Sequence, residues 1–408
     1  MSKTRILTIL IGMLPLLMVL GNSMLIPILP EFEEALSLTS AQTSLMLSIF
    51  SIPAALVIPF VGFLSDRFGR KRLIIISLLF IMIGGILCIF SGLMKYPEGY
   101  YLLLTGRFIQ GLGTGGTTPL AMALIGDLFE GEQRSKELGI LEVFNGAAKV
   151  VAPIIGALLA LLTWYSPFFV FPIIGCLTLI GITMFVKTAS AGISRQSLPG
   201  YLSGIRRVIG REKNWLFSTY FYGGTGMFLL FGMLYYLSYL IQQTYHIDGF
   251  FKGFVFSFPL GALTISSYWT GKQIKTDHLI IKKLMLIGSG LLCLAFFFLL
   301  FFHTVPPLLF FVTIGFGGLG FILPCINTLI TSSVDDAERG FVVGVYGVAR
   351  FTGVALGPIV FSSWMSDSGS MFIYMYIILV FAQITYWWSQ YHTGKATKRL
   401  AIKPFCKE

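Results

Sequence analysis

Charged and polar side chains recur within two long apolar stretches of the chain. Glu142, Asn145 and Lys149 are spaced at i, i+3 and i+7, so a helix would carry all three on one face. Arg350 lies in the second apolar stretch. A carboxylate in such surroundings can exchange a proton, and the cations can bind an acidic group, so the pattern favours an anionic or zwitterionic ligand. A structural alternative pairs Lys149 with Glu142 and Arg350 with helix carbonyls.

The composition around these side chains is too apolar for a soluble domain. Of 408 residues, 55% are hydrophobic and 12% are charged, whereas soluble domains carry about 25% charged residues. The sequence therefore predicts an integral membrane protein. None of the four histidines lies near the middle of an apolar run, and the five cysteines show no metal-ligand spacing, so no metal site is expected.

Twelve apolar stretches are long enough to cross a membrane, which takes about 20 residues. They cover 6–29, 42–64, 73–93, 101–124, 138–162, 167–187, 215–241, 251–270, 282–302, 307–330, 341–363 and 371–391. We expect an all-α protein of two six-helix bundles, over 1–187 and 214–392. A basic cytoplasmic linker over 188–213 joins them, and a basic cytoplasmic tail follows over 393–408.

The positions of lysine and arginine predict the orientation, because these residues gather in cytoplasmic loops. Of 29 such residues, only Lys95 and Lys252 fall on the other side if the N-terminus is inside, and three lie within spans. Both termini are thus expected in the cytoplasm, with the protein in the plasma membrane. The net charge of +11 is a topology signal and does not indicate a nucleic-acid partner.

The halves also repeat, since aligning Arg134 with Arg339 brings Pro153 onto Pro358. Two repeats with a substrate site between them are an architecture of many secondary transporters.

The loop between the second and third spans reads GFLSDRFGRKR. It resembles the G-x-L-x-D-R-x-G-R-[KR] signature of the major facilitator superfamily, in residue order and in its place after span two. In that family the loop is a latch that closes the cytoplasmic side when the transporter faces outward. The resemblance implies a latch formed by Gly62, Asp66, Arg67, Gly69, Arg70 and Lys71. Glycines permit a tight turn and close packing here, and the cations can pair with Asp127 at the end of span four.

Further motifs resemble the drug/proton antiporters of this superfamily. Arg107 to Gly111 matches R-x-x-Q-G, and Gly353 to Pro358 has the small-xxx-small spacing that lets membrane helices approach. Span five carries Pro153 at the equivalent place, but alanines replace the glycines there. We expect bending or close packing of helices at Pro153, Gly353, Gly357 and Pro358.

These patterns give two sets of candidate residues. For proton coupling the candidates are Arg107, Asp127 and Glu142, with Glu142 first; a structural role for Arg107 stays open. For the substrate cavity they are Asn22, Gln110, Asn145, Lys149, Tyr235, Tyr239 and Arg350. The tyrosines are also consistent with packing or an interfacial aromatic belt.

The expected function is proton-coupled export of small amphipathic compounds, such as drugs or an acidic metabolite or siderophore, by alternating access. The alternative is a flippase for a lipid or a lipid-linked headgroup on the same fold. A ligand sensor is disfavoured by the intact latch motif, and sugar import by the loss of that pattern in the loop between spans eight and nine. We expect no enzymatic activity and no cofactor besides the proton gradient. The partners expected are a small-molecule substrate and membrane lipid, and the protein is expected to be a monomer.

Overall fold

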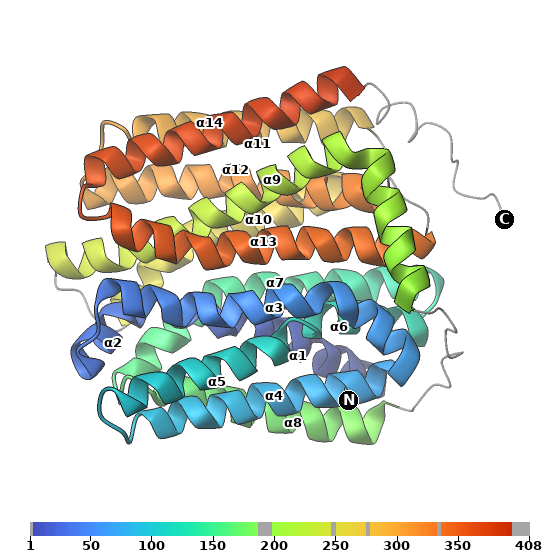
Figure 1. The fold of residues 1–408 in the computed structure, drawn as a ribbon, viewed down its shortest axis with the longest axis horizontal. Helices are drawn as coiled ribbons and strands as arrows, with labels where there is room; N and C mark the ends of the chain where they lie inside the picture. The colour runs from blue at the N-terminus through green and yellow to red at the C-terminus, as the bar shows by residue number, and fades with distance from the viewer. Residues whose placement is uncertain (1–2, 187–197, 246–249, 275–277, 333–335, 394–408) are drawn as a thin grey trace.

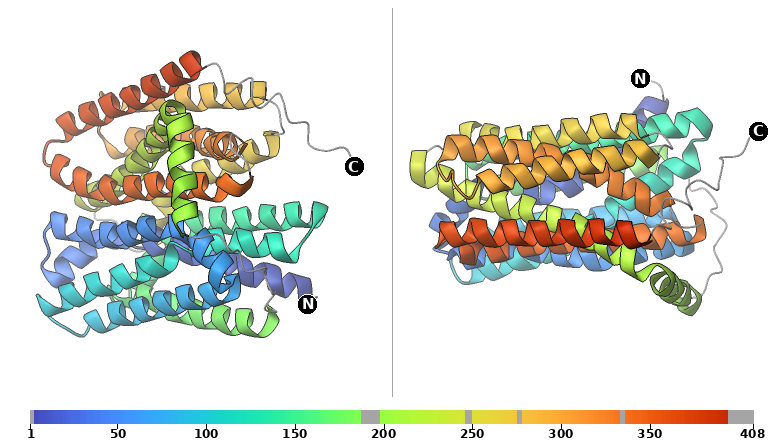
Figure 2. Two further views of the ribbon diagram at one scale, coloured as in Figure 1. Left: turned by 45° about the vertical axis from the view of Figure 1, so that its right-hand side comes forward. Right: turned by 90° about the horizontal axis from the view of Figure 1, so that it is seen from above.

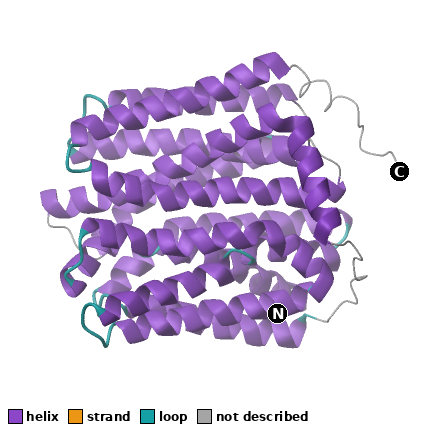
Figure 3. Cartoon of the chain, in the orientation of Figure 1, coloured by secondary structure: helices purple, strands orange, loops and turns teal. Residues whose placement is uncertain are grey.

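A computed structural model describes residues 3–186, 198–245, 250–274, 278–332 and 336–393, and within these ranges the chain is helical with no strand (Figure 3). The first half comprises α1 (Lys3–Ser23), η1 (Ile26–Ile28), α2 (Leu29–Leu36), α3 (Ser40–Phe68), α4 (Arg70–Ser91), α5 (Glu98–Thr114), α6 (Thr117–Leu128), α7 (Gly131–Ala160), η2 (Ser166–Phe169) and α8 (Val170–Phe185). The second half comprises α9 (Leu198–Tyr245), α10 (Phe250–Gln273), α11 (His278–Phe298), α12 (Val305–Ser332), α13 (Asp336–Trp364) and α14 (Ser368–Thr393).

The helices run side by side in two groups, α1–α8 and α9–α14 (Figure 1). The first part of α9 turns across one end of the molecule, next to both groups (Figure 2). That part, from Leu198, falls within the expected linker, whose residues 188–197 lie outside the described ranges, as does the tail over 394–408. Below, the "α2 end" is the end that holds α2, and the "Gly69 end" is the opposite one, where α3 gives way to α4.

Each of the twelve predicted spans corresponds to one helix or to a few short consecutive helices in the described ranges. Within the described residues, ten helical stretches are long and apolar enough to cross a membrane by length and composition. Span four is broken in two, because α5 ends at Thr114 and α6 starts at Thr117. Large apolar side chains remain exposed on the helices, among them Leu177, Met184, Ile265 and Phe310. Surface of this kind is costly in water and is covered by lipid in a membrane.

Local sequence sets where several helices begin and end. Thr39 starts α3 with a capping box, since its hydroxyl accepts a bond from the Gln42 backbone and the Gln42 side chain accepts one from the Thr39 backbone. Gly69 lies between α3 and α4 with φ of +88°, a backbone conformation that residues other than glycine rarely adopt. The sharp turn expected at Gly69 is therefore present.

Small residues bring helices into direct contact inside each half. A Cβ on Gly84 of α4 would lie 2.5 Å from the Gly106 carbonyl of α5, and one on Gly288 of α11 would lie 2.6 Å from the Gly318 carbonyl of α12. Such close approach supplies the van der Waals packing that holds membrane helices together.

Candidate functional site

The side chains singled out on α7 and Arg350 of α13 lie about midway along their helices, close enough for their charges to interact. Glu142 is exposed, and Asn145, Lys149 and Arg350 are partly exposed, while Gly146 and Ala148 beside them are buried. The charges of Arg350 and Glu142 both act on Lys149, the first repelling its ammonium group and the second attracting it. We call Glu142, Asn145, Lys149 and Arg350 the midway cluster.

In the described part of the chain, neither cation of this cluster has a polar partner. Among the described residues, Lys149 makes no hydrogen bond and no direct ion pair, and Arg350 contacts only the Tyr346 ring, 5.7 Å from its guanidinium carbon. The structural alternative, in which Lys149 pairs with Glu142 and Arg350 with carbonyls, is therefore wrong for this conformation. The buried Oδ1 atom of Asn145 also lacks a hydrogen-bond partner within the described ranges. Polar and charged groups that lack protein partners at membrane depth are typical of a site that binds a ligand.

Arg107 differs from these cations because it is fully enclosed by partners. Its guanidinium donates to Gln110 Oε1 at 2.6 Å, to Asn22 Oδ1 at 2.5 Å and to the Met46 carbonyl at 3.4 Å. It also lies 4.2 Å from the centre of the Phe50 ring. The network ties α5 to α1 and α3 within one half.

Asn22 and Gln110, expected in the substrate cavity, are engaged in the Arg107 network in this conformation. They are 4% and 0% exposed, respectively, and both accept bonds from Arg107. Asn22 also donates to Ser51 Oγ at 2.8 Å. The reason is electrostatic: a buried guanidinium is costly unless oxygen atoms surround it, and these two amides supply them.

Tyr235 and Tyr239, also expected in the cavity, instead join the two halves at the α2 end. The Tyr239 hydroxyl donates to Glu33 Oε1 at 2.5 Å, and the Tyr235 hydroxyl donates to the Ser40 carbonyl at 2.8 Å. Both rings are buried, with exposures of 0% for Tyr235 and 6% for Tyr239. In this conformation they connect the two halves at that end.

A second contact at the same end was not predicted from the sequence. Lys252 of α10 is 0% exposed, donates to Gln242 Oε1 at 2.6 Å and lies 3.6 Å from Glu31 Oε1. The sequence did offer one indication of this contact, because the predicted orientation puts Lys252 and Glu31 on the same side of the membrane. Together with the tyrosines these groups form what we call the α2-end clasp: Glu31, Glu33, Ser40, Tyr235, Tyr239, Gln242 and Lys252.

Further hydrogen bonds join the two halves between the middle of the helices and the α2 end. Ser48 of α3 donates to the Ala355 carbonyl of α13 at 2.6 Å, and Thr264 of α10 donates to the Gly146 carbonyl of α7 at 3.4 Å. In this structure the two halves are therefore held together at the α2 end.

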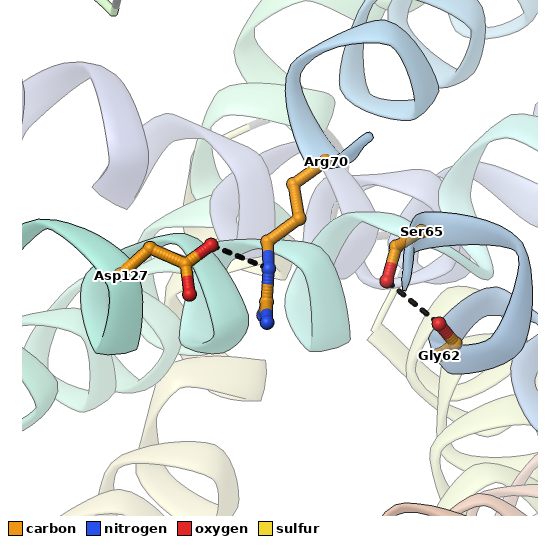
Figure 4. A network of polar contacts seen from close by, with 4 residues as sticks. All are labelled: Gly62, Ser65, Arg70 and Asp127. Carbon is orange, nitrogen blue, oxygen red and sulfur yellow. Dashed lines mark hydrogen bonds and ion pairs between the residues drawn. The ribbon is translucent and has the colours of Figure 1, made fainter. Parts of the chain in front are cut away.

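At the Gly69 end, the basic loop binds neighbouring helices. Arg70 Nε lies 2.5 Å from Asp127 Oδ2 at the end of α6 (Figure 4). Lys71 donates to the carbonyls of Thr183 and Val186, at 2.9 and 2.5 Å, where α8 ends. A cation is favourable there because the carbonyls at a helix C-terminus carry partial negative charge.

The other members of the expected latch have lesser roles in this conformation. A Cβ on Gly62 would meet nothing within 4 Å, so the expected close packing at Gly62 is absent; its carbonyl accepts a bond from Ser65 Oγ (Figure 4). Arg67 is exposed, and the Asp66 side chain lies outside the described part of the chain.

The expected packing residues lie at close helix contacts. A Cβ on Gly353 would be 2.2 Å from the Gly224 carbonyl of α9, and one on Gly357 would be 2.7 Å from the Phe228 carbonyl. The Pro153 carbonyl of α7 faces Gly253 of α10, whose Cβ would lie 2.6 Å away. Pro358 lies inside α13, directly after Gly357.

Comparison with known proteins agrees with this architecture. Residues 11–358 match the model of the Major Facilitator Superfamily. The chain is 39% identical to a "Bacillibactin exporter" of Bacillus subtilis (strain 168), over 87% of this chain and 88% of that protein. It is 32% identical to "Multidrug resistance protein MdtL" of Salmonella typhimurium, over 43% of this chain and 45% of that protein.

The fold has solved counterparts. A bacterial homologue of the human lysosomal transporter Spinster, crystallised in an inward-facing and unoccupied conformation, superposes with a TM-score of 0.75, covering 97% of this chain and 98% of that one at 16% identity. The predicted twelve-span fold is thereby confirmed. The chain is a multi-pass membrane transporter that belongs to the Major Facilitator Superfamily.

Proposed function

We propose that this transporter exports small compounds that carry acidic groups, such as a siderophore or an anionic drug. The observation that carries the proposal is the pair of cations, Lys149 and Arg350, on opposite halves and without polar partners in the described ranges. A charge at membrane depth is expensive, so an unpaired one is retained where a ligand neutralises it. The similarity to a protein named as an exporter of bacillibactin supports the same class of substrate.

The contrast with the other buried cations supports a ligand-binding role for this pair. Arg107 and Lys252 are 0% exposed and are surrounded by side-chain and backbone oxygens. Lys149 and Arg350 remain partly exposed. An acidic group placed between them would contact both halves at once, as alternating access requires of a substrate.

The transport cycle follows from the clasp at the α2 end. With the lysine- and arginine-rich loops in the cytoplasm, the α2 end faces outward and both termini face inward. A state closed at the α2 end then loads substrate from the cytoplasm. Release outward requires the clasp to open and the Gly69 end to close, where Arg70 and Asp127 already pair.

Proton coupling is proposed to involve Glu142, because its charge acts on Lys149 and therefore on any anion bound there. Arg107 and Asp127 stay second candidates by resemblance to the drug/proton antiporters. Arg107 is enclosed in its network, and Asp127 is engaged with Arg70. Of these three side chains, Glu142 is the one that both remains exposed and acts on the substrate cations.

Inverted membrane vesicles with an acidic lumen test the function. The vesicles receive bacillibactin as the acidic probe and ethidium as a cationic one, with Lys149→Ala, Arg350→Ala and, as a control, Lys136→Ala at an exposed position of α7. We expect gradient-dependent accumulation of bacillibactin, a rise of lumenal pH with it, and loss of both in the two midway variants. Accumulation of ethidium alone, untouched by either variant, would contradict the proposal.

A further inference from the structure

Tyr346 of α13 lies next to the Arg350 side chain and also packs against a second aromatic ring. Its ring is 2% exposed and stacks on Tyr220 of α9, with centroids 6.0 Å apart and planes 26° apart. The guanidinium carbon of Arg350 lies 5.7 Å from the centre of the Tyr346 ring, within the range of a cation–π contact.

The geometry of α13 produces this arrangement. Arg350 follows Tyr346 by four residues, and helical side chains lean toward the N-terminus, so the guanidinium reaches back over the ring one turn earlier. Tyr220 is fixed to the same helix, because its hydroxyl donates to the Val342 carbonyl at 2.9 Å.

Gly223 of α9 makes room for the stack. A Cβ at this position would lie 2.5 Å from Cε2 and 2.7 Å from the hydroxyl oxygen of Tyr346, so a larger residue would displace the ring. The close contact of α9 and α13 thus also fixes where Tyr346 lies.

Lys149 supplies the reason why Arg350 needs such support. The two cations repel each other, and an arginine side chain is long and loses rotamer freedom when it is fixed. Without a support the guanidinium would turn away from Lys149, and a substrate would have to bring it back at a cost in affinity. An aromatic face holds the cation and leaves its N–H donors free for an acidic ligand.

We propose that Tyr346 is a positioning residue for substrate recognition: its ring, stacked on Tyr220, holds Arg350 toward Lys149. The inference rests on the proposed binding of an acidic group by Lys149 and Arg350. The ring carries this role, since the Tyr346 hydroxyl has no hydrogen-bond partner among the described residues.

The test measures initial rates of bacillibactin uptake into inverted vesicles as a function of its concentration. Tyr346→Leu removes the aromatic face, and Tyr346→Phe keeps it while removing the hydroxyl. Gly223→Ala displaces the ring, with Gly261→Ala, which meets nothing within 4 Å, as its control. Elution in detergent and the amount in the membrane show that each variant folds.

We expect Tyr346→Leu and Gly223→Ala to raise KM for bacillibactin about three- to tenfold with little change in maximal rate. Tyr346→Phe and Gly261→Ala should behave as the wild type. Equal losses in Tyr346→Phe and Tyr346→Leu would overturn the inference, because the hydroxyl would then be the group required. Wild-type KM in Tyr346→Leu would overturn it as well.

Arg350→Ala separates this inference from the proposed function. If Arg350→Ala raises KM and Tyr346→Leu does not, the positioning role is wrong while the acidic-substrate site stands. If Arg350→Ala leaves KM unchanged, the proposed site itself is wrong, and the role of Tyr346 fails with it.

Discussion

Lys149 of α7 and Arg350 of α13 belong to opposite halves of the molecule, yet Arg350 lies close enough to repel the Lys149 ammonium group. Both are partly exposed, and neither has a polar partner in the described part of the chain. Bringing two like charges together in apolar surroundings is unfavourable. In the proposed function, an acidic substrate compensates for that cost and is bound between the halves.

Reversing the charge of Lys149 should convert its repulsion of Arg350 into attraction. We predict that Lys149→Glu pairs with Arg350 across the halves and lowers uptake of acidic compounds about tenfold or more, because the net charge of the site becomes negative. Vesicle uptake measures this, with Lys136→Glu as the control at an exposed position of the same helix. Uptake of bacillibactin at the wild-type rate in Lys149→Glu would mean that the substrate does not meet this residue.

The Arg107 network should matter for stability more than for substrate affinity. Asn22→Ala removes one of the oxygens around the guanidinium, and a buried hydrogen bond broken on one side costs about 1–3 kcal/mol. We expect a lower midpoint of thermal unfolding in detergent, whereas Asn327→Ala, at an exposed position of α12, should leave the midpoint unchanged. If Asn22→Ala were as stable as the wild type but had a higher KM, Asn22 would instead be a substrate-binding residue.

The clasp at the α2 end should set how often that end opens. Tyr239→Phe removes the donor to Glu33 and should raise the open population about tenfold or more, as one hydrogen bond to a charged group contributes about 1.5–3 kcal/mol. Labelling of Ser44→Cys, a buried position between the halves, by a maleimide that does not cross membranes reports the opening. Tyr101→Phe, at an exposed position, is the control. Equal labelling in both variants would show that the clasp does not hold the end closed.

The ion pair at the Gly69 end should be specific but weak. The Arg70 and Asp127 side chains are 22% and 29% exposed, so the pair is expected to contribute about 1 kcal/mol or less, up to about fivefold in a conformational equilibrium. Transport rates of Arg70→Asp, Asp127→Arg and the double exchange measure it. The double exchange should recover part of the activity lost in each single variant, and no recovery would indicate that the two residues act separately.

Features that depend on local periodicity could be predicted from the sequence. Apolar stretches of about 20 residues located the spans, and the spacing of Glu142, Asn145 and Lys149 placed them on one face of α7. The turn at Gly69 was also predictable, because a glycine between two apolar stretches is the ordinary sign of a sharp change in backbone direction.

Features that depend on pairing between distant segments were not predictable in this way. Tyr239 and Glu33 are 206 positions apart, and Arg107 and Asn22 are 85 apart. A single sequence shows that such groups are polar and membrane-embedded, but not which of them satisfy one another. For this reason the tyrosines and both amides were assigned to the cavity, although they are buried against partners.

The central claim is that Lys149 and Arg350 bind the same acidic ligand, and a double-mutant cycle on the purified transporter tests it most directly. The measured quantity is the Kd of bacillibactin for the wild type, Lys149→Ala, Arg350→Ala and the double variant. We predict that each single variant weakens binding and that the double variant is weakened by less than the product of the two effects, because residues that share a ligand are not additive. Unchanged Kd values in both single variants would contradict the account.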